Sequence, residues 1–193
     1  YIVFCGVHFM AETADILSSD HQKVILPNLT AGCSMADMAS TEEVQRCWKE
    51  LSDIFDSDSG KQPVIPVTYM NSTASIKSLC GQNNGIVCTS SNAKQAFDWA
   101  YDKGERILFV PDQHLGRNTA KDYGIKESEM VIWDPYKKNG GLSVDEIINS
   151  KIILWKGHCS VHTRFSVQQI ENAKIKNPDV NILVHPECTN EVV

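Results

Sequence analysis

The chain has 193 residues, with 18 Lys and Arg against 24 Asp and Glu, which gives a formal net charge of −6. This acidic balance argues against an extensive nucleic-acid-binding face, which needs clustered basic residues, and no apolar run approaches the roughly 20 residues of a membrane-spanning helix. With 42% hydrophobic and 22% charged residues, the composition is that of an ordinary globular protein and is too apolar for a disordered one.

The chain contains seven cysteines. An odd number rules out complete internal disulfide pairing, and a chain of this length and apolar content does not need a disulfide framework in order to fold. We therefore expect free thiols in a reducing compartment, some of them available to bind metal.

The two ends of the sequence predict a piece of a longer polypeptide. Tyr1 opens directly on an apolar run, and Val193 closely follows a second strand-like run. The start has no basic segment followed by an apolar one, so no secretion signal is predicted. The length suits one domain or two small ones.

Short runs rich in Val and Ile alternate with stretches suited to helices. The runs lack the every-second-residue alternation of half-exposed strands, which is typical of strands buried on both faces of a parallel sheet. In chain order, the predicted strands are 2–4, 23–26, 64–67, 85–87, 106–110, 151–154 and 181–184, and the predicted helices are 10–17, 42–55, 92–103, 144–150 and 166–176. This alternation predicts an α/β fold, with the polar segments 57–61 and 134–141 as surface loops.

One strand-and-loop unit occurs twice in loosely similar form. The stretch KVILPNLTAGC ends at Cys33, and KIILWKGHC ends at Cys159. Chance similarity between two buried strands explains the match as well as a true repeat does. If the repeat is real, related sub-domains direct their post-strand loops toward a shared centre, because parallel sheets bind ligands at the carboxyl ends of their strands.

Cys33 and Cys159 are the cysteines placed best for chemistry. The chain has no Cys-x-x-Cys pair, so a zinc site with closely spaced ligands is poorly supported. Single thiolates from separate loops suit an iron–sulfur cluster instead. The alternative is that a cysteine is simply a small buried hydrophobic residue. That interpretation fits Cys5, Cys47, Cys80 and Cys88 best.

Two histidines near the C-terminal end of the sequence are candidate functional residues. His162 comes three residues after Cys159, and His185 begins the sequence His-Pro-Glu-Cys, with Glu187 two residues on. The His185–Glu187 pair suits acid–base catalysis, and it equally suits a structural hydrogen bond.

Two further histidines carry weaker signals. His114 follows the predicted strand 106–110, with Asp112 two residues before it. This Asp–His pair either anchors a loop or contacts a ligand. His21 lies in a polar turn and is expected to be exposed to solvent.

Two clusters of small polar residues, 69–73 and 89–93, each end a strand and open a helix. Ser, Thr and Asn at such positions cap helices, and the free first-turn N–H groups also bind carboxylates and phosphates. Capping alone is the simpler interpretation, whereas the neighbouring Tyr69 favours an anion site. The chain has no Walker loop, Gly-x-Gly-x-x-Gly or Gly-x-Ser-x-Gly motif, so nucleotide binding and serine-hydrolase chemistry have no support.

Seven stretches of the chain match a known family in order and run through it nearly end to end. They are GVHFMAETADIL, LPNLTAGCSMADMA, VTYMNSTASIK, CTSSNA, PDQHLG, WKGHCSVH and HPEC. With these motifs the chain resembles the quinolinate synthase, or quinolinate synthetase A, family. The resemblance implies a transferase of NAD biosynthesis that condenses iminoaspartate with dihydroxyacetone phosphate to form quinolinate, releasing phosphate and water.

The same resemblance implies a fold and a domain division. The family has three homologous αβα sub-domains, with short parallel sheets, arranged with pseudo-threefold symmetry around a central [4Fe–4S] cluster. In this chain the arrangement is expected to be incomplete: residues 1–40 are the end of sub-domain one, 41–150 sub-domain two, and 151–193 the start of sub-domain three. An N-terminal segment and a C-terminal segment with the third cluster cysteine are expected to be missing, so the piece alone is expected to be inactive.

The resemblance also assigns roles to individual residues. Cys33 and Cys159 match two of the three cluster ligands, whereas Cys188 matches none. The cluster keeps an open iron position that acts as a Lewis acid. The residues that match substrate-binding positions are Tyr69, Asn71, Ser90, His185 and Glu187. Of these, Tyr69, His185 and Glu187 are the candidates for catalysis by proton transfer.

The remaining implications concern partners and location. The expected partners are the two small-molecule substrates, with a functional link to L-aspartate oxidase or aspartate dehydrogenase, and neither nucleic acid nor a membrane. The expected location is the bacterial cytoplasm, with a plastid as the alternative. The competing hypothesis for the whole chain is a non-catalytic α/β ligand-binding module whose thiols are structural.

Overall fold

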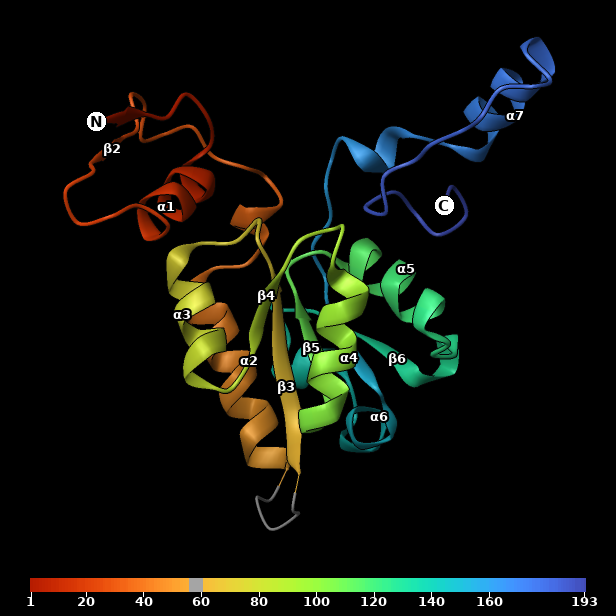
Figure 1. Cartoon of the computed structure of the whole chain (residues 1–193). Coiled ribbons are helices and arrows are strands. Elements are labelled where there is room, and N and C mark those ends of the chain that lie inside the picture. The colour runs from red at the N-terminus through yellow and green to blue at the C-terminus, as the bar shows by residue number, and fades with distance from the viewer. Residues whose placement is uncertain (56–60) are drawn as a thin grey trace.

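A five-stranded, fully parallel sheet organises the middle of the chain (Figure 1). The structure is a computed structural model and describes residues 1–55 and 61–193. The strand order is β4-β3-β5-β7-β6. The strands are β3 (Gln62–Tyr69), β4 (Ile86–Cys88), β5 (Gly104–Val110), β6 (Met130–Trp133) and β7 (Ile152–Trp155). The predicted α/β fold with parallel strands is confirmed.

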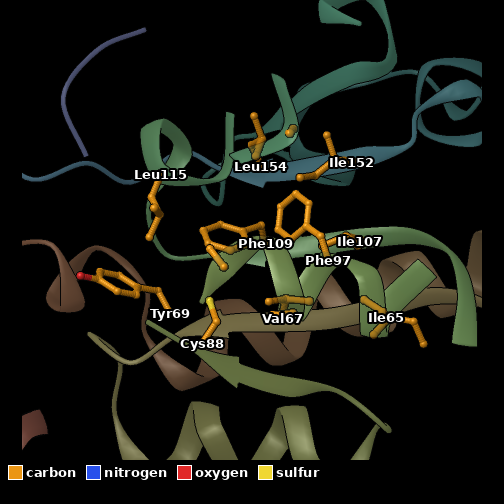
Figure 2. Packing of buried hydrophobic residues seen from close by; sticks show 14 of the residues in the cluster. Ile65, Val67, Tyr69, Cys88, Phe97, Ile107, Phe109, Leu115, Ile152 and Leu154 are labelled. Atoms are coloured by element: carbon orange, nitrogen blue, oxygen red, sulfur yellow. The ribbon is translucent and has the colours of Figure 1, made fainter. Parts of the chain in front are cut away.

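Helices cover both faces of this sheet, so the central strands are buried on both sides. On one face, strand residues such as Val67, Phe109 and Leu154 pack with Phe97 and Leu115 of α4 (Ala93–Lys103) and α5 (Gln113–Tyr123) (Figure 2). Because successive strand residues point to opposite faces, their neighbours form a second core. That core includes residues of α2 (Thr41–Ile54), α3 (Ala74–Gln82) and α6 (Val144–Asn149).

Several of the helices begin where a side chain caps the first turn. Ser40 and Glu43 form a capping box at α2, and Ser143 and Glu146 form one at α6. The Thr73 hydroxyl accepts a hydrogen bond from the Ile76 N–H at α3. Such caps satisfy N–H groups that have no partner within the helix. The polar clusters 69–73 and 89–93 do lie between a strand and a helix, as predicted.

A small N-terminal part lies beyond the carboxyl ends of the central strands (Figure 1). It contains β1 (Ile2–Val3) paired in parallel with β2 (Val24–Ile25), the helix α1 (His8–Ile16) and the short 3-10 helix η1 (Ala36–Met38). The Glu12 carboxylate of α1 accepts a hydrogen bond of 2.8 Å from the Ala74 N–H at the start of α3. The two short strands are partly exposed, so the expectation of burial on both faces is wrong here.

The C-terminal part lies at the same end of the sheet (Figure 1). It contains the 3-10 helix η4 (His162–Arg164) and α7 (Val167–Lys176), followed by an irregular segment. The predicted strand 181–184 is wrong. Leu183 is 98% exposed, and no strand of the described residues lies beside this segment to receive its hydrogen bonds.

The helix α5 and the strand β6 have no counterpart among the predicted elements, and α3 was expected only as the helix that the 69–73 cluster opens. The segment 134–141 forms turns and the short helix η3 (Lys138–Gly141), in which Asn139 and Gly140 have positive φ. A further 3-10 helix, η2 (Glu127–Glu129), precedes β6. Most of the other predicted loop, 57–61, lies outside the described residues.

The division into units remains a prediction. The central sheet includes β7, so it extends past residue 150, the expected end of the second sub-domain. Among the helices of residues 1–55 and 61–193, none combines the length and apolar character needed to cross a membrane.

Candidate active site and metal centre

Tyr69 and Glu187 meet at the carboxyl edge of the sheet, although 118 residues separate them. Tyr69 is the last residue of β3. Its ring lies at the end of the hydrophobic core, and its hydroxyl points away from the other core residues (Figure 2). That hydroxyl donates a buried hydrogen bond of 2.8 Å to Glu187 Oε1. From β3 the chain first adds β4 on one side and then β5 on the other. Open α/β sheets bind ligands at such a switch point, here between β3 and β5.

Two histidine rings flank the Glu187 carboxylate. His162 Nδ1 lies 3.0 Å from Oε2, and His185 Nδ1 lies 3.8 Å from Oε1. The rings stack on each other with centroids 4.6 Å apart and planes 26° apart. His185 Nδ1 accepts a hydrogen bond from the Glu187 N–H, so a neutral His185 carries its proton on Nε2. The predicted His185–Glu187 pair therefore makes a structural hydrogen bond, and the His185 ring still presents its Nε2 edge.

Burial and the neighbouring carboxylate raise the pKa of Tyr69. Desolvation is the largest cause, the charge of Glu187 and the hydrogen bond to it come next, and a hydrogen bond with Ser90 opposes them. Tyr69 is therefore a neutral phenol near neutral pH and acts as a hydrogen-bond donor. The interaction with Ser90 also places that predicted substrate-binding residue beside Tyr69.

Asn71 lies in the loop that follows β3 and is half-buried. Its side chain makes no hydrogen bond to any other residue within 1–55 and 61–193. The residues Tyr69, Asn71, Ser90, His185 and Glu187 thus come from three loops. The structure brings Tyr69, Ser90, His185 and Glu187 together, and it places Asn71 two residues from Tyr69.

Asp112 is a fully buried acid at the end of β5. Its Oδ1 accepts hydrogen bonds from the N–H groups of His114 and Leu115, at 2.7 and 2.8 Å, and so begins α5. Its Oδ2 has no hydrogen-bond partner among the described residues. Burial raises the pKa of Asp112 to about 7, although the Leu115 N–H acts to lower it. Of the two alternatives, the structure favours a loop anchor.

Asn118 holds the loop that carries His185 and Glu187. From α5, its Nδ2 donates to the carbonyl oxygens of Pro186 and Cys188, at 2.8 and 2.9 Å. Its Oδ1 accepts from Asn190 Nδ2 at 2.8 Å. No sequence pattern points to Asn118, because its role depends on a loop 68 residues away.

The loops of Cys33 and Cys159 also meet. Ser34 Oγ and Ser160 Oγ, next to the two cysteines, are 3.3 Å apart. The Trp155 indole N–H, at the end of β7, donates to the Met38 carbonyl oxygen at 2.8 Å. Both thiols are free, half-buried and packed against the core on the α4–α5 side of the sheet.

These two thiols fit an iron–sulfur cluster in chemistry and position. Each comes singly from a loop after a parallel strand, and neither is sealed inside the core.

The other thiols suit the role of cluster ligand less well. Burial raises the pKa of Cys80 and of Cys88 to about 12, and also raises the pKa values of Cys47 and Cys188. The expected burial of Cys47, Cys80 and Cys88 is confirmed, whereas that of Cys5, which is exposed, is wrong.

Gly157 allows the Cys159 loop to lie directly on the end of β5. A Cβ at this position would overlap the Pro111 carbonyl oxygen. The Gln113 N–H donates to the Gly157 carbonyl oxygen at 2.9 Å. The two loops are therefore joined through backbone contacts that only glycine permits.

Cys159, His162 and Glu187 form a group with metal-ligand chemistry. A thiol sulfur, an imidazole nitrogen and a carboxylate oxygen from these residues all lie within 4.8 Å of one another. His162 Nδ1 is buried and has no hydrogen-bond partner in the described part of the chain, since its approach to Glu187 lacks hydrogen-bond geometry.

The chain is similar to known proteins over its whole length. The family model described as Quinolinate synthetase A protein matches residues 1–193. The chain is 57% identical over 192 residues to a quinolinate synthase of Corynebacterium glutamicum, all of this chain aligning with 48% of that protein. The whole chain is also 54% identical to a quinolinate synthase of Streptomyces coelicolor and 57% identical to one of Bacillus thuringiensis, covering 48% and 51% of those proteins.

The chain thus spans about half the length of the curated relatives that it matches. The match covers every loop described above, from Cys33 to Glu187. On this evidence the chain belongs to the quinolinate synthetase A family.

Proposed function

We propose that this chain carries part of the active site of a quinolinate synthase, which condenses iminoaspartate with dihydroxyacetone phosphate and releases quinolinate, phosphate and water. The observation that carries this proposal is the meeting of Tyr69, Glu187 and His185 at the sheet edge toward which the Cys33 and Cys159 loops also converge. Similarity to quinolinate synthases across the whole chain supports the same reaction.

Cys33 and Cys159 would hold a [4Fe–4S] cluster, together with a third cysteine outside these 193 residues. With three thiolate ligands, such a cluster keeps one iron open and supplies a Lewis acid for loss of water. The half-buried position of both thiols supports this assignment, because a ligand thiol must be reachable from the substrate site.

The protein's own residues bind anions and move protons. Both substrates are anionic although the chain carries a net charge of −6, so anion binding has to be local. Ser90 and the N-terminal turn of α4 supply hydroxyl and N–H donors for this purpose. Tyr69 offers a phenol proton, and His185 offers an Nε2 edge that can donate or accept a proton.

Glu187 orients both of these groups. It accepts the Tyr69 hydrogen bond through Oε1, and its backbone N–H fixes the His185 ring. A carboxylate that is 3% exposed keeps its partners in a single arrangement, which is what positioned proton transfer requires.

The wider assignments follow from the same proposal. The three-part division 1–40, 41–150 and 151–193 describes pieces of three related sub-domains around the cluster. The setting is the bacterial cytoplasm, with a functional link to L-aspartate oxidase or aspartate dehydrogenase as the source of iminoaspartate. The 193-residue piece alone has little or no activity, which an assay of the purified piece with both substrates tests.

Anaerobic reconstitution of the full-length protein tests the proposal. Cys33→Ser and Cys159→Ser should each abolish the visible iron–sulfur absorbance and quinolinate formation. Cys5→Ser is the matched control, because Cys5 is exposed and lies in a different loop, and it should retain both. If both of these variants keep absorbance and activity, the assignment of Cys33 and Cys159 as cluster ligands is wrong. The competing hypothesis of a non-catalytic α/β binding module with structural thiols predicts instead normal folding and ligand binding after both substitutions, with no iron bound.

A further inference from the structure

We propose that Cys159, His162 and Glu187 form a site for a single thiophilic divalent cation of the Zn²⁺ class when the protein holds no iron–sulfur cluster. The three donor atoms lie within 4.8 Å of one another. Sulfur, imidazole nitrogen and carboxylate oxygen are the donor types that Zn²⁺ takes in proteins. A small closing movement of the side chains brings them to ligand distances.

An unsatisfied nitrogen points to a missing partner at this position. His162 Nδ1 is buried and has no hydrogen-bond partner among the described residues, although Glu187 Oε2 is only 3.0 Å away. Leaving a buried polar atom unpaired costs free energy, and a cation between the nitrogen and the carboxylate would satisfy both.

The local chain geometry fixes the first two ligands. Cys159 and His162 are three residues apart, and the Thr163 N–H donates to the Cys159 carbonyl oxygen at 3.1 Å. The helix η4 begins at His162 itself. A tight turn of this kind presents the thiol and the imidazole on the same side, as in zinc sites whose ligands are close in sequence.

The third ligand is already oriented by neighbours. Tyr69 donates to Oε1 of Glu187 and leaves Oε2 directed at His162. Asn118 holds the backbone on both sides of Glu187 through the carbonyl oxygens of Pro186 and Cys188. Supporting hydrogen bonds of this type are what aligns the ligands of metal sites.

Charge and ligand number also suit a dication. A Cys159 thiolate and a Glu187 carboxylate together carry two negative charges, which neutralise one M²⁺, while His162 binds as the neutral imidazole. Binding releases the thiol proton to solvent, so atoms and charge balance. Three protein ligands leave a fourth position for water.

This site shares Cys159 with the proposed cluster and Glu187 with the proposed active site. Occupation by a single cation therefore excludes the cluster and removes a carboxylate from the substrate site. The inference goes beyond the proposed function, because the three residues retain their geometry whether or not the protein synthesises quinolinate.

Co²⁺ binding to the cluster-free, full-length protein under anaerobic conditions is the test. We expect one Co²⁺ per chain, a thiolate-to-cobalt charge-transfer band, and displacement by Zn²⁺. Cys159→Ser should abolish the band, and His162→Ala should weaken Co²⁺ binding at least about tenfold. His162→Gln, checked for folding by circular dichroism, provides a second variant that keeps the side-chain volume closer to that of His.

Two controls separate this site from its neighbours. His185→Ala removes the ring that stacks on His162 without removing a ligand, and should retain the charge-transfer band. Cys33→Ser should lose the iron–sulfur cluster and still bind Co²⁺, so failure of the proposed function and failure of this site give different results. Absence of the band in the unsubstituted protein overturns the inference, as does a band that Cys33→Ser abolishes and His162→Ala leaves unchanged.

Discussion

The central sheet and the two terminal parts of the chain are built differently. Strands β3, β5 and β7 are covered by helices on both faces, and Phe97, Phe109 and Leu154 have no exposed surface. In the terminal parts, Val3 is 62% exposed and Leu183 is 98% exposed. The sheet supplies a rigid edge, whereas the terminal parts supply reactive side chains without a core of comparable size.

The candidate site lies where these regions meet. Tyr69 and Ser90 come from the central unit, and Cys33, His162 and Glu187 come from the terminal parts. The junctions include polar contacts between these regions, such as Tyr69 to Glu187 and Trp155 to the Met38 carbonyl. The difference teaches that the stability of the fold depends mainly on the core of the sheet, whereas the assembly of the site depends on contacts at its edge, so the two can be perturbed separately.

The largest expected effect is on the central core. Phe97→Ala should lower the free energy of unfolding by about 3–5 kcal/mol, because it removes a fully buried ring that packs edge-on against Phe109. Urea denaturation followed by circular dichroism measures this loss. The matched control is Phe165→Ala in the C-terminal part, where the ring is 50% exposed and the expected loss is below about 1 kcal/mol. Equal losses would show that the two regions do not differ as described.

The second effect concerns the buried acid at the edge of the sheet. The pKa of Asp112 is raised to about 7 in the folded chain from 3.8, so the folded state holds a proton that the unfolded state has lost. Stability of the metal-free chain should therefore fall as pH rises from about 4 to about 7, by on the order of 4 kcal/mol.

Asp112→Asn tests this assignment. The variant keeps an Oδ1 acceptor for the His114 and Leu115 N–H groups but does not titrate. It should flatten the fall in stability and exceed the unsubstituted chain in stability at pH 8, as measured by thermal unfolding at several pH values. Asp20→Asn, at an exposed position, should leave the profile unchanged. Parallel profiles for Asp112→Asn and the unsubstituted chain would contradict the raised pKa.

A smaller and more local effect is expected from Asn118→Ala. It removes the hydrogen bonds to Pro186, Cys188 and Asn190, which contribute about 2 kcal/mol together. Hydrogen exchange should speed up in residues 185–192, while β3 and β5 stay protected. Asn149→Ala, in which one exposed bond to the Asp145 carbonyl is lost, is the control. Faster exchange throughout the sheet would mean that the loop and the core are not separable.

The central strands could be predicted because continuous apolar runs are diagnostic of strands buried on both faces. The helix α5 was missed because its buried residues include Gly116, Asn118 and Thr119, which give no apolar periodicity. The segment 181–184 was wrongly predicted because an apolar run signals a strand only if another strand pairs with it. Whether a partner strand lies beside a segment depends on the folded chain and not on the local sequence.

The candidate site could also be predicted from the sequence only in part. Cys33 and Cys159 could be selected from their positions after strands, and Tyr69, His185 and Glu187 from the motifs that contain them. That His162 approaches Glu187, and that Asn118 holds its loop, depends on packing between segments that are distant in sequence. Residue spacing carries no information about such contacts.

The central claim is that the site is assembled by a contact between the sheet edge and the C-terminal part, and a double-mutant cycle on Tyr69 and Glu187 tests it most directly. Tyr69→Phe, Glu187→Ala and the combined variant should be compared by their free energies of unfolding. We predict a coupling energy of about 1 kcal/mol or more, because each single change removes the same buried hydrogen bond. Additivity of the two changes to within about 0.3 kcal/mol would contradict the claim, because residues that are not in contact behave in that way.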